Sequence, residues 1–180
     1  ELERLDPGYQ VYFGKNDSIY IGDHLEKIYN VFEGVEKGSA QKLKKFIRKA
    51  SDNYKIAMND LVYRPGISPL ELITPETIKK LGYFFSNIKK EVTNEFKNPK
   101  LIQILQFPVL FLGAKPADTP AFYNFMNFAD FGLGTWHPKN GMYSIVEAMV
   151  SLAKSLGVKI FLNSPVKKIL LEKNKAIGIK

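Results

Sequence analysis

The sequence predicts an α+β fold that is mainly helical, with a small antiparallel sheet at its start and a helix followed by strands at its end. Three observations predict it. Apolar and polar residues alternate near the N-terminus, apolar residues recur at helical spacing from residue 25 to about residue 131, and alternation returns after residue 157. A chain of 180 residues is long enough for one well-buried core, with or without an appended piece.

The first 21 residues predict a β-hairpin, because residues 9–13 and 18–21 alternate and residues 14–17 between them have turn composition. Helical spacing then predicts two helices from residue 25 to about 63, broken around residues 34–38. Prolines interrupt this pattern at residues 64–69. Helices resume after predicted N-terminal caps, which are Thr74, Ser86, Asn98 and Thr119.

The chain changes character at Gly141. A helix is predicted over residues 142–156, with Gly157 as its stop, and strands over residues 158–162, 166–171 and from 176 onwards. Because the last strand reaches Lys180 without a stop signal and the first residue is Glu1, we expect an internal piece of a longer protein.

Composition excludes several classes of protein and site. With 45% hydrophobic and 24% charged residues, the chain resembles ordinary globular proteins rather than disordered or fibrous ones. The apolar run at residues 107–114 is far shorter than the roughly 20 residues of a membrane-spanning helix. Without cysteine, and with only two histidines, the sequence predicts no disulfide and no metal site.

The net charge of +8 attracts polyanions, but only three of the 26 cations are arginines. Since guanine edges are read best by arginine, sequence-specific DNA binding is disfavoured, and we predict no nucleic-acid partner. A lysine-rich nucleic-acid module remains an alternative. The basic run over residues 37–49 is typical of a solvated helix face; contact with anionic lipid headgroups is the sharper interpretation.

No independent catalytic set emerges from the sequence, so catalytic residues are left unassigned. The carboxylates are scattered, and His24 and His137 are interpreted as structural. Gly132 and Gly134 begin a glycine-rich run that lacks the third glycine of a dinucleotide fingerprint and has neither a preceding strand nor a following helix. We therefore predict a loop there.

Aromatic residues are dense in the middle of the chain, with eight in the thirty residues 107–136. Such a stripe is usually core, but these rings project over more than one helix face, an excess that a long hydrocarbon ligand would use. The candidate substrate-binding residues are Phe107, Phe111, Phe122, Tyr123, Phe125, Phe128 and Trp136.

Four stretches, at residues 4–9, 107–123, 134–143 and 156–169, together resemble bacterial-type phytoene desaturases and related carotenoid desaturases of the flavin amine-oxidase-like superfamily. The resemblance covers nearly the whole chain, and its Trp-x-Pro-x-x-Gly-Met part is fairly specific. It implies an FAD-dependent oxidoreductase in which a polyene-binding domain, residues 1–137, is inserted into a discontinuous FAD-binding domain, of which residues 138–180 are a returning piece.

The same resemblance implies cofactor-binding residues. Val166 would offer backbone groups to the adenine end of FAD, and Gly141 and Met142 would lie on the loop that approaches the flavin and the polyene. His137 and Asn140 depart from the family, which usually has tyrosine and glycine there; asparagine tolerates a left-handed backbone, so we expect the turn to survive.

The implied activity is dehydrogenation of a C30 or C40 polyene held in a dry apolar tunnel, in a cytoplasmic protein whose lysines contact an anionic membrane surface. The 180 residues alone are expected to be inactive and to bind no stoichiometric FAD. Alternatives are another flavin amine-oxidase-like oxidoreductase, such as a retinol saturase-like protein, and an independent lipid- or polyene-binding module.

Overall fold

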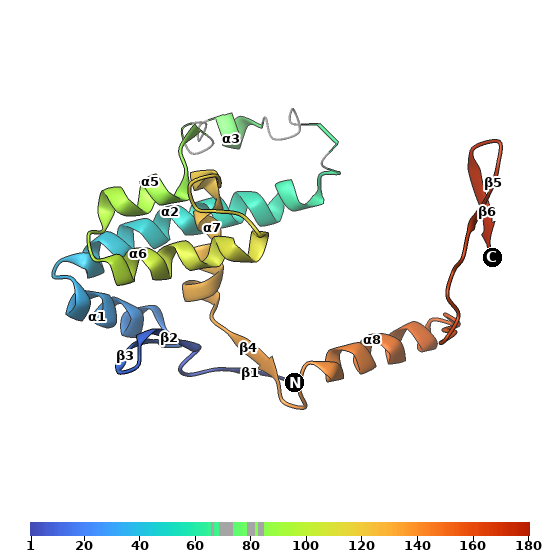
Figure 1. Ribbon diagram of the computed structural model, residues 1–180, viewed down its shortest axis with the longest axis horizontal. Coiled ribbons are helices and arrows are strands. Elements are labelled where there is room, and N and C mark those ends of the chain that lie inside the picture. Colours follow the sequence, from blue (N-terminus) through green and yellow to red (C-terminus); the bar gives the residue numbers. More distant parts are fainter. Residues whose placement is uncertain (66, 69–73, 79–81, 83–84) are drawn as a thin grey trace. The chain divides into compact units, whose positions relative to one another are not determined.

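A computed structural model describes residues 1–65, 67–68, 74–78, 82 and 85–180 (Figure 1). The predicted α+β class is confirmed, because helices predominate and the strands pair in small two-stranded sheets. The chain divides into two compact units, Glu1–His137 and Pro138–Lys180. The predicted break in residues 64–69 falls partly on residues outside the described ones, namely Gly66 and Pro69.

The predicted hairpin is confirmed as β2 (Tyr9–Gly14) paired antiparallel with β3 (Asp17–Ile21), in the register Tyr9↔Ile21 and Val11↔Ile19. Its inner face is anchored by Ile19 and Ile21, which are buried in the core of the first unit. A second sheet, missed by sequence reasoning, joins β1 (Leu2–Arg4) to β4 (Trp136–Pro138).

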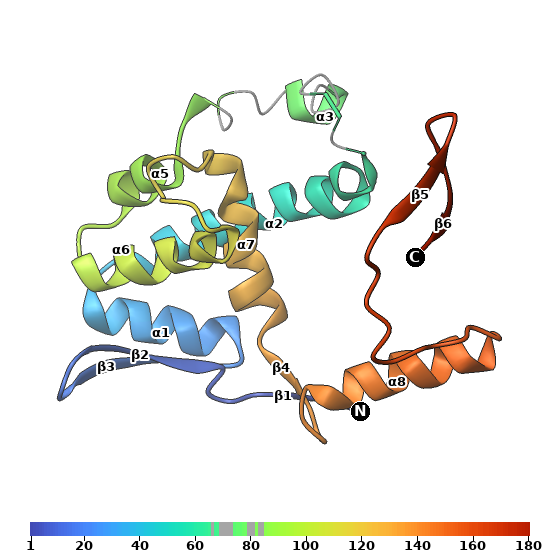
Figure 2. The same ribbon diagram turned by 45° about the vertical axis from the view of Figure 1, so that its right-hand side comes forward.

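The helices of the first unit enclose an aromatic core. Figures 1 and 2 show α1, α2, α5 and α6 side by side above the hairpin. Phe32 lies at the centre, in edge contact with Phe96 at 6.2 Å and with Phe131 at 6.0 Å between ring centroids. The elements are α1 (Leu25–Val35), α2 (Ser39–Asn59), η1 (Leu61–Tyr63), α3 (Pro75–Ile78), α5 (Ile88–Glu95), α6 (Pro99–Gln106) and η3 (Phe107–Leu112).

Two of the four predicted caps are confirmed. The Asn98 side chain accepts a hydrogen bond from Lys100 N, and Thr74 Oγ1 accepts one from Thr77 N. The prediction for Ser86 was wrong by one residue, because Asn87 caps α5. The carbonyl of Asn87 accepts the helical hydrogen bond from Glu91 N, whereas the carbonyl of Ser86 accepts a hydrogen bond from Ala121 N. The prediction for Thr119 was also wrong, since its hydroxyl donates to Lys115 O.

The helix predicted from residue 121 to about 131 is instead a succession of three windings. These are η4 (Ala121–Asn124), a 3₁₀ turn; α7 (Phe125–Phe128); and η5 (Ala129–Leu133), a π turn. Because each winding has a different number of residues per turn, successive aromatic rings point in different directions. The predicted loop is corrected at Gly132, which lies in the π turn η5. Among the described residues, α7 rather than a strand comes directly before this turn, and the short strand β4 rather than a helix follows Gly134 and Thr135.

In the second unit, the predicted helix is confirmed as α8 (Tyr143–Ser155), and Gly157 follows it at φ 82°. A hairpin of β5 (Ile169–Glu172) and β6 (Lys175–Ile179) closes through a left-handed turn that includes Asn174. The strand predicted over residues 158–162 was wrong: these residues pair with no strand in the described chain, and alternation alone does not make a ladder. No helix among the described residues is long and apolar enough to cross a membrane.

Candidate functional site

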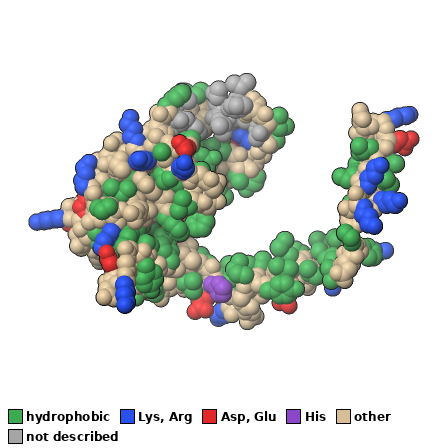
Figure 3. Space-filling view, in the orientation of Figure 1, with side chains coloured by type: hydrophobic (Ala, Val, Ile, Leu, Met, Phe, Trp, Pro, Cys, Tyr) green, Lys and Arg blue, Asp and Glu red, His purple; other side chains and the backbone are tan. Residues whose placement is uncertain are grey.

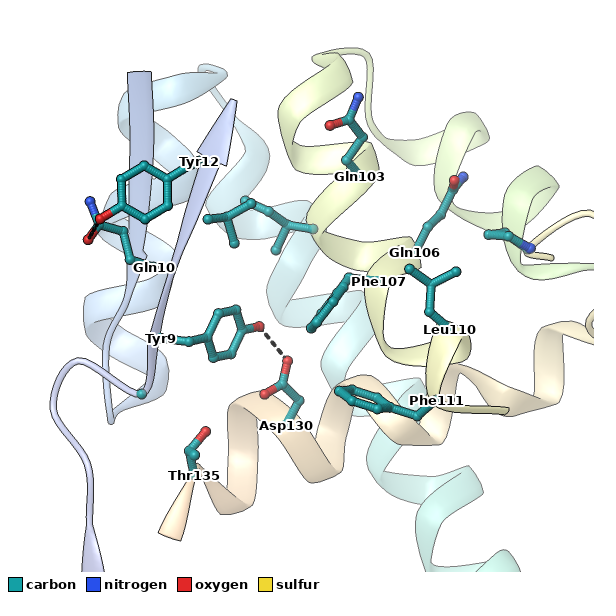
Figure 4. Close-up of a pocket in the computed structure, with 14 residues that line it drawn as sticks. Tyr9, Gln10, Tyr12, Gln103, Gln106, Phe107, Leu110, Phe111, Asp130 and Thr135 are labelled. Atoms are coloured by element: carbon teal, nitrogen blue, oxygen red, sulfur yellow. Dashed lines mark hydrogen bonds between the residues drawn. The ribbon is translucent and has the colours of Figure 1, made fainter. Parts of the chain in front are cut away.

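A pocket of about 780 Å³ opens between the hairpin and the end of α6, within the first unit (Figure 4). This volume lies in the range of ordinary small-molecule sites. We name it the hairpin pocket; it is lined by Gly8, Tyr9, Gln10, Val11, Tyr12, Gln103, Ile104, Gln106, Phe107, Leu110, Phe111, Pro116, Asp130 and Thr135.

One wall of the hairpin pocket is apolar and exposed. Phe107, Leu110 and Phe111 are 40%, 56% and 74% exposed, respectively, whereas Pro108 and Val109 between them are buried. The 3₁₀ winding of η3 places Phe107 and Leu110 one above the other, because residues three apart in such a helix share a face. The apolar run therefore packs against the core through Pro108 and Val109 and presents Phe107, Leu110 and Phe111 to open space.

The rings of this wall continue into the hairpin. The centroid of Tyr9 lies 6.1 Å from that of Phe107, and Phe107 lies 5.3 Å from Phe111. Figure 4 shows the rings of Tyr9, Phe107 and Phe111 one after another along the pocket, with Leu110 beside them. The aromatic surface is therefore built from two elements distant in sequence, β2 and η3.

A polar pair interrupts the apolar lining. Tyr9 Oη donates a 2.5 Å hydrogen bond to Asp130 Oδ2, and both side chains line the pocket (Figure 4). Burial raises the pKa of Asp130, although the hydrogen bond from Tyr9 opposes this shift. Burial, together with the Asp130 carboxylate, also raises the pKa of Tyr9. Tyr9 therefore remains a protonated donor at neutral pH.

Sequence reasoning missed Asp130, which it counted among scattered carboxylates. The sequence does contain one indication of its importance. Asp130 is the one charged residue within residues 121–133, and the other residues of this stretch are apolar or carry amides. A carboxylate in such a setting is generally paired or functional.

The other predicted aromatic residues do not join the hairpin pocket. Phe122, Tyr123 and Phe125 line a second pocket of about 560 Å³ together with residues at the end of α2 and in η1. The Phe122 ring is buried, 5.7 Å from that of Phe125. The structure thus places five of the seven predicted substrate-binding residues in two separate pockets.

Phe128 and Trp136 lie in neither pocket. Phe128 packs against the core and stands 5.4 Å from the ring of Tyr54. Trp136 is 49% exposed; its Nε1 donates to Leu133 O, and the Arg4 guanidinium lies 5.7 Å from its ring centre. Its neighbour Thr135 lines the hairpin pocket, so the tryptophan segment adjoins that pocket without its ring entering it.

A buried polar network holds η4 against α2 and α5. Asn53 Nδ2 donates to Asn124 Oδ1 at 2.9 Å, and Asn124 Nδ2 donates to the Glu91 carboxyl at 3.1 and 3.2 Å. Burial raises the pKa of Glu91 to about 7, against the opposing effects of Asn124 and Lys49. The network fixes the segment that carries Phe122 and Tyr123.

The predicted cofactor residues all belong to the second unit. The backbone N–H and C=O of Val166 bond to no described residue, so both are available to a ligand. Gly141 adopts φ 82° and a Cβ there would meet nothing within 4 Å, while Met142 is 62% exposed. The turn expected at Asn140 is present, since Gly141 N donates to Pro138 O at 2.9 Å, and the positive φ of this turn lies at Gly141.

Comparison with known proteins gives the family. The model of the family "Flavin containing amine oxidoreductase" matches residues 75–179, more than half of the chain. The chain is 31% identical over 94% of its length to a carotenoid 3,4-desaturase of Haloarcula japonica. It is 26% identical over 99% to a zeta-carotene-forming phytoene desaturase of Myxococcus xanthus, and 26% identical over 96% to a 4,4'-diapophytoene desaturase of Staphylococcus haemolyticus.

The chain spans about a third of the length of these relatives, 35% in each case. All three similarities extend over both units, and the family match reaches from α3 to β6. This chain therefore belongs to the flavin containing amine oxidoreductase family.

Proposed function

We propose that the full-length protein holding this chain is an FAD-dependent desaturase that dehydrogenates a long apolar polyene. In this proposal, residues 1–137 supply polyene-binding surface and residues 138–180 are part of the FAD-binding domain. The relatives named as carotenoid desaturases support the activity. The observation that carries the proposal for this chain is the exposed apolar wall formed by Phe107, Leu110 and Phe111.

Such a wall is suited to hydrocarbon. Apolar side chains of this size are normally buried, and their exposure inside a pocket leaves apolar area for a ligand to cover. At about 25 cal/mol per Å², covering roughly 300 Å² of hydrocarbon contributes roughly 7 kcal/mol before the costs of ordering the ligand. The polyene is therefore held by area, with water excluded from the rings of Tyr9, Phe107 and Phe111.

The residues proposed to bind FAD have backbone groups and open space that suit contact with it. Val166 has free backbone donor and acceptor groups, and the space around Gly141 is open. When bound, FAD supplies the hydride acceptor for the hydrogen removed from the chain. Val166 would hydrogen-bond the adenine end of FAD, and Gly141 would let the backbone turn close to the flavin.

Exposed apolar side chains on α8 support the assignment of the second unit to a larger domain. No residue of α8 is buried, and Figure 3 shows hydrophobic side chains along this helix. A helix of this kind normally buries such a face against neighbouring elements. The exposed members include Ile145, Val146, Met149 and Leu152.

We also propose peripheral contact with an anionic membrane through the outer face of α2. Lys45, Arg48 and Lys49 are exposed there, whereas Lys42 is paired with Glu36 at 2.7 Å. Each exposed cation near an anionic surface contributes about 1 kcal/mol. Sedimentation of the full-length protein with anionic but not with neutral vesicles is expected; equal sedimentation with both would remove this part of the proposal.

The activity is tested by anaerobic mixing of the full-length, FAD-loaded protein with polyene-containing vesicles. The expected result is loss of oxidised-flavin absorbance together with a new double bond in the polyene, detected as a red shift of its absorption. If phytoene, 4,4'-diapophytoene and partly desaturated carotenes all leave the flavin oxidised, the proposed activity is wrong. Reduction by a retinoid alone would favour another oxidoreductase of the family.

A further inference from the structure

We infer that the hairpin pocket selects an isoprenoid chain bearing a hydroxyl group, which donates a hydrogen bond to Asp130. This inference rests on the proposed function, since it specifies the substrate class of the same pocket. It departs from the simplest expectation, in which hydrocarbon is held by area alone and the pocket needs no polar group.

The Asp130 carboxylate has an acceptor atom to spare. Oδ2 accepts the hydrogen bond from Tyr9, while Oδ1 accepts none from any described residue. Oδ1 is not fully enclosed by the protein, and Asp130 lines the pocket. In Figure 4 this second oxygen is turned away from Tyr9, toward the side on which Thr135 lies.

A pure hydrocarbon filling the pocket would exclude solvent from Oδ1 and would offer it no hydrogen-bond donor. The carboxyl oxygen would then be left without a partner in apolar surroundings, a state that forfeits its solvation with nothing in return. A ligand hydroxyl at the same place restores the lost hydrogen bond. In such sites the loss of affinity for an analogue that lacks the hydroxyl is larger than the gain in affinity from the hydroxyl itself.

The polar groups of the lining are unevenly placed, which gives the ligand a direction. The Gln103 and Gln106 amides project from α6 on the far side of the pocket from Asp130 (Figure 4), and Gln103 is exposed to solvent. Phe107, Leu110 and Phe111 lie between the two polar regions. The geometry therefore fits a hydroxyl at Asp130 with the apolar chain along the phenylalanine wall.

The test compares geranylgeraniol with the matching hydrocarbon, in which a hydrogen atom replaces the hydroxyl group. Their dissociation constants are measured on the native, FAD-loaded full-length protein by calorimetry in mixed micelles. We expect the alcohol to bind about tenfold more tightly, the factor that one hydrogen bond to a buried polar group typically gives. Equal affinities, or tighter binding of the hydrocarbon, would overturn the inference, and this comparison needs no variant.

Variants locate the preference. Asp130→Leu is expected to bring the affinity ratio to about one, mainly by strengthening binding of the hydrocarbon, and retention of the tenfold ratio would refute the role of Asp130. The matched control is Asp118→Leu, which removes an exposed carboxylate outside the pocket and is expected to leave the ratio unchanged. Because binding is measured without turnover, failure of flavin reduction would count against the proposed activity and leave this ratio intact.

Discussion

Tyr9 and Asp130, 121 residues apart in the chain, are joined by a 2.5 Å hydrogen bond that ties the hairpin to the π turn η5. Around this bond the lining is largely apolar, including the rings of Phe107 and Phe111. The bond thus serves two purposes: it satisfies a buried carboxylate, and it holds the hairpin wall of the pocket in place.

Replacing Tyr9 by phenylalanine is expected to lower the free energy of unfolding by about 1 to 2 kcal/mol, because a mostly buried carboxyl loses its donor while the ring packing survives. Denaturant titration of the full-length protein measures the change. The matched control is Tyr20→Phe, whose side chain is 55% exposed on the same hairpin and outside the pocket; its loss should stay within about 0.5 kcal/mol. Equal losses in the two variants would show that the Tyr9–Asp130 bond is not structural.

Glu91 predicts a pH dependence of stability. Its folded pKa of about 7 lies above the ordinary value of 4.5, so the folded protein holds this proton more tightly than the unfolded chain does. The resulting stability is fully present below pH 4.5 and is lost as pH rises through about 7. Glu91→Gln should abolish this slope and exceed the native stability at pH 8 by about 1 to 3 kcal/mol.

Glu95→Gln is the control for that prediction. It should retain the slope, with its midpoint at slightly lower pH, because the Glu95 charge contributes to raising the pKa of Glu91. Stability curves of the native protein and Glu91→Gln that run parallel from pH 4 to 8 would contradict the proposed burial of a titrating carboxyl.

Glu36 predicts the opposite dependence. Its carboxylate accepts hydrogen bonds from Lys97 N at 2.9 Å, Asn98 N at 2.7 Å and Lys42 Nζ at 2.7 Å, and thereby joins α1 to the start of α6. Burial alone would raise its pKa, but these bonds outweigh burial and lower the pKa to about 2. The stability it contributes is present above pH 4.5 and is lost as pH falls through about 2.

Glu36→Gln should therefore be clearly less stable than the native protein at pH 7 and nearly equal to it at pH 2. Glu26→Gln, whose carboxylate is 77% exposed and 3.8 Å from Lys44, should have little effect at either pH. A stability loss for Glu36→Gln that does not depend on pH would mean that the lost packing, rather than the lost charge, is responsible.

Gly134 and Gly113 offer a paired test of the segment before Trp136. Gly134 has φ 79° and ψ 175°, a conformation essentially restricted to glycine, and a Cβ there would stand 2.6 Å from Arg4 Nε. Gly113 has φ 67° and ψ 21°, with nothing near its missing Cβ. The decrease in melting temperature caused by Gly134→Ala should be several times larger than that caused by Gly113→Ala. Equal decreases would contradict the close approach of Arg4.

Sequence reasoning predicted the elements whose signals are local. The hairpin at residues 9–21, the division between α1 and α2, and the Asn98 cap each follow from period, turn composition or a cap within a few residues. It failed where distant segments decide the outcome. The Ser86 carbonyl accepts a backbone hydrogen bond from Ala121, so the cap of α5 lies at Asn87 instead, and residues 158–162 have no partner strand in the part of the chain that the structure describes.

Aromatic density selected Phe107 and Phe111, which line the hairpin pocket, as candidate substrate-binding residues, and that role stays a prediction. It did not predict that the three windings from Ala121 to Leu133 place Phe122 and Phe125 in a separate pocket. The Tyr9–Asp130 pair escaped notice because its members are brought together by tertiary structure alone.

The most direct measurement is the affinity of the full-length protein for its polyene after Phe111→Ala. Phe111 is 74% exposed, so its loss should leave stability within about 0.5 kcal/mol of native while weakening polyene binding about tenfold. Phe85→Ala, which removes a ring that is 88% exposed and outside the hairpin pocket, should leave the affinity unchanged. If the two variants bind polyene as tightly as the native protein, the phenylalanine wall does not hold the substrate.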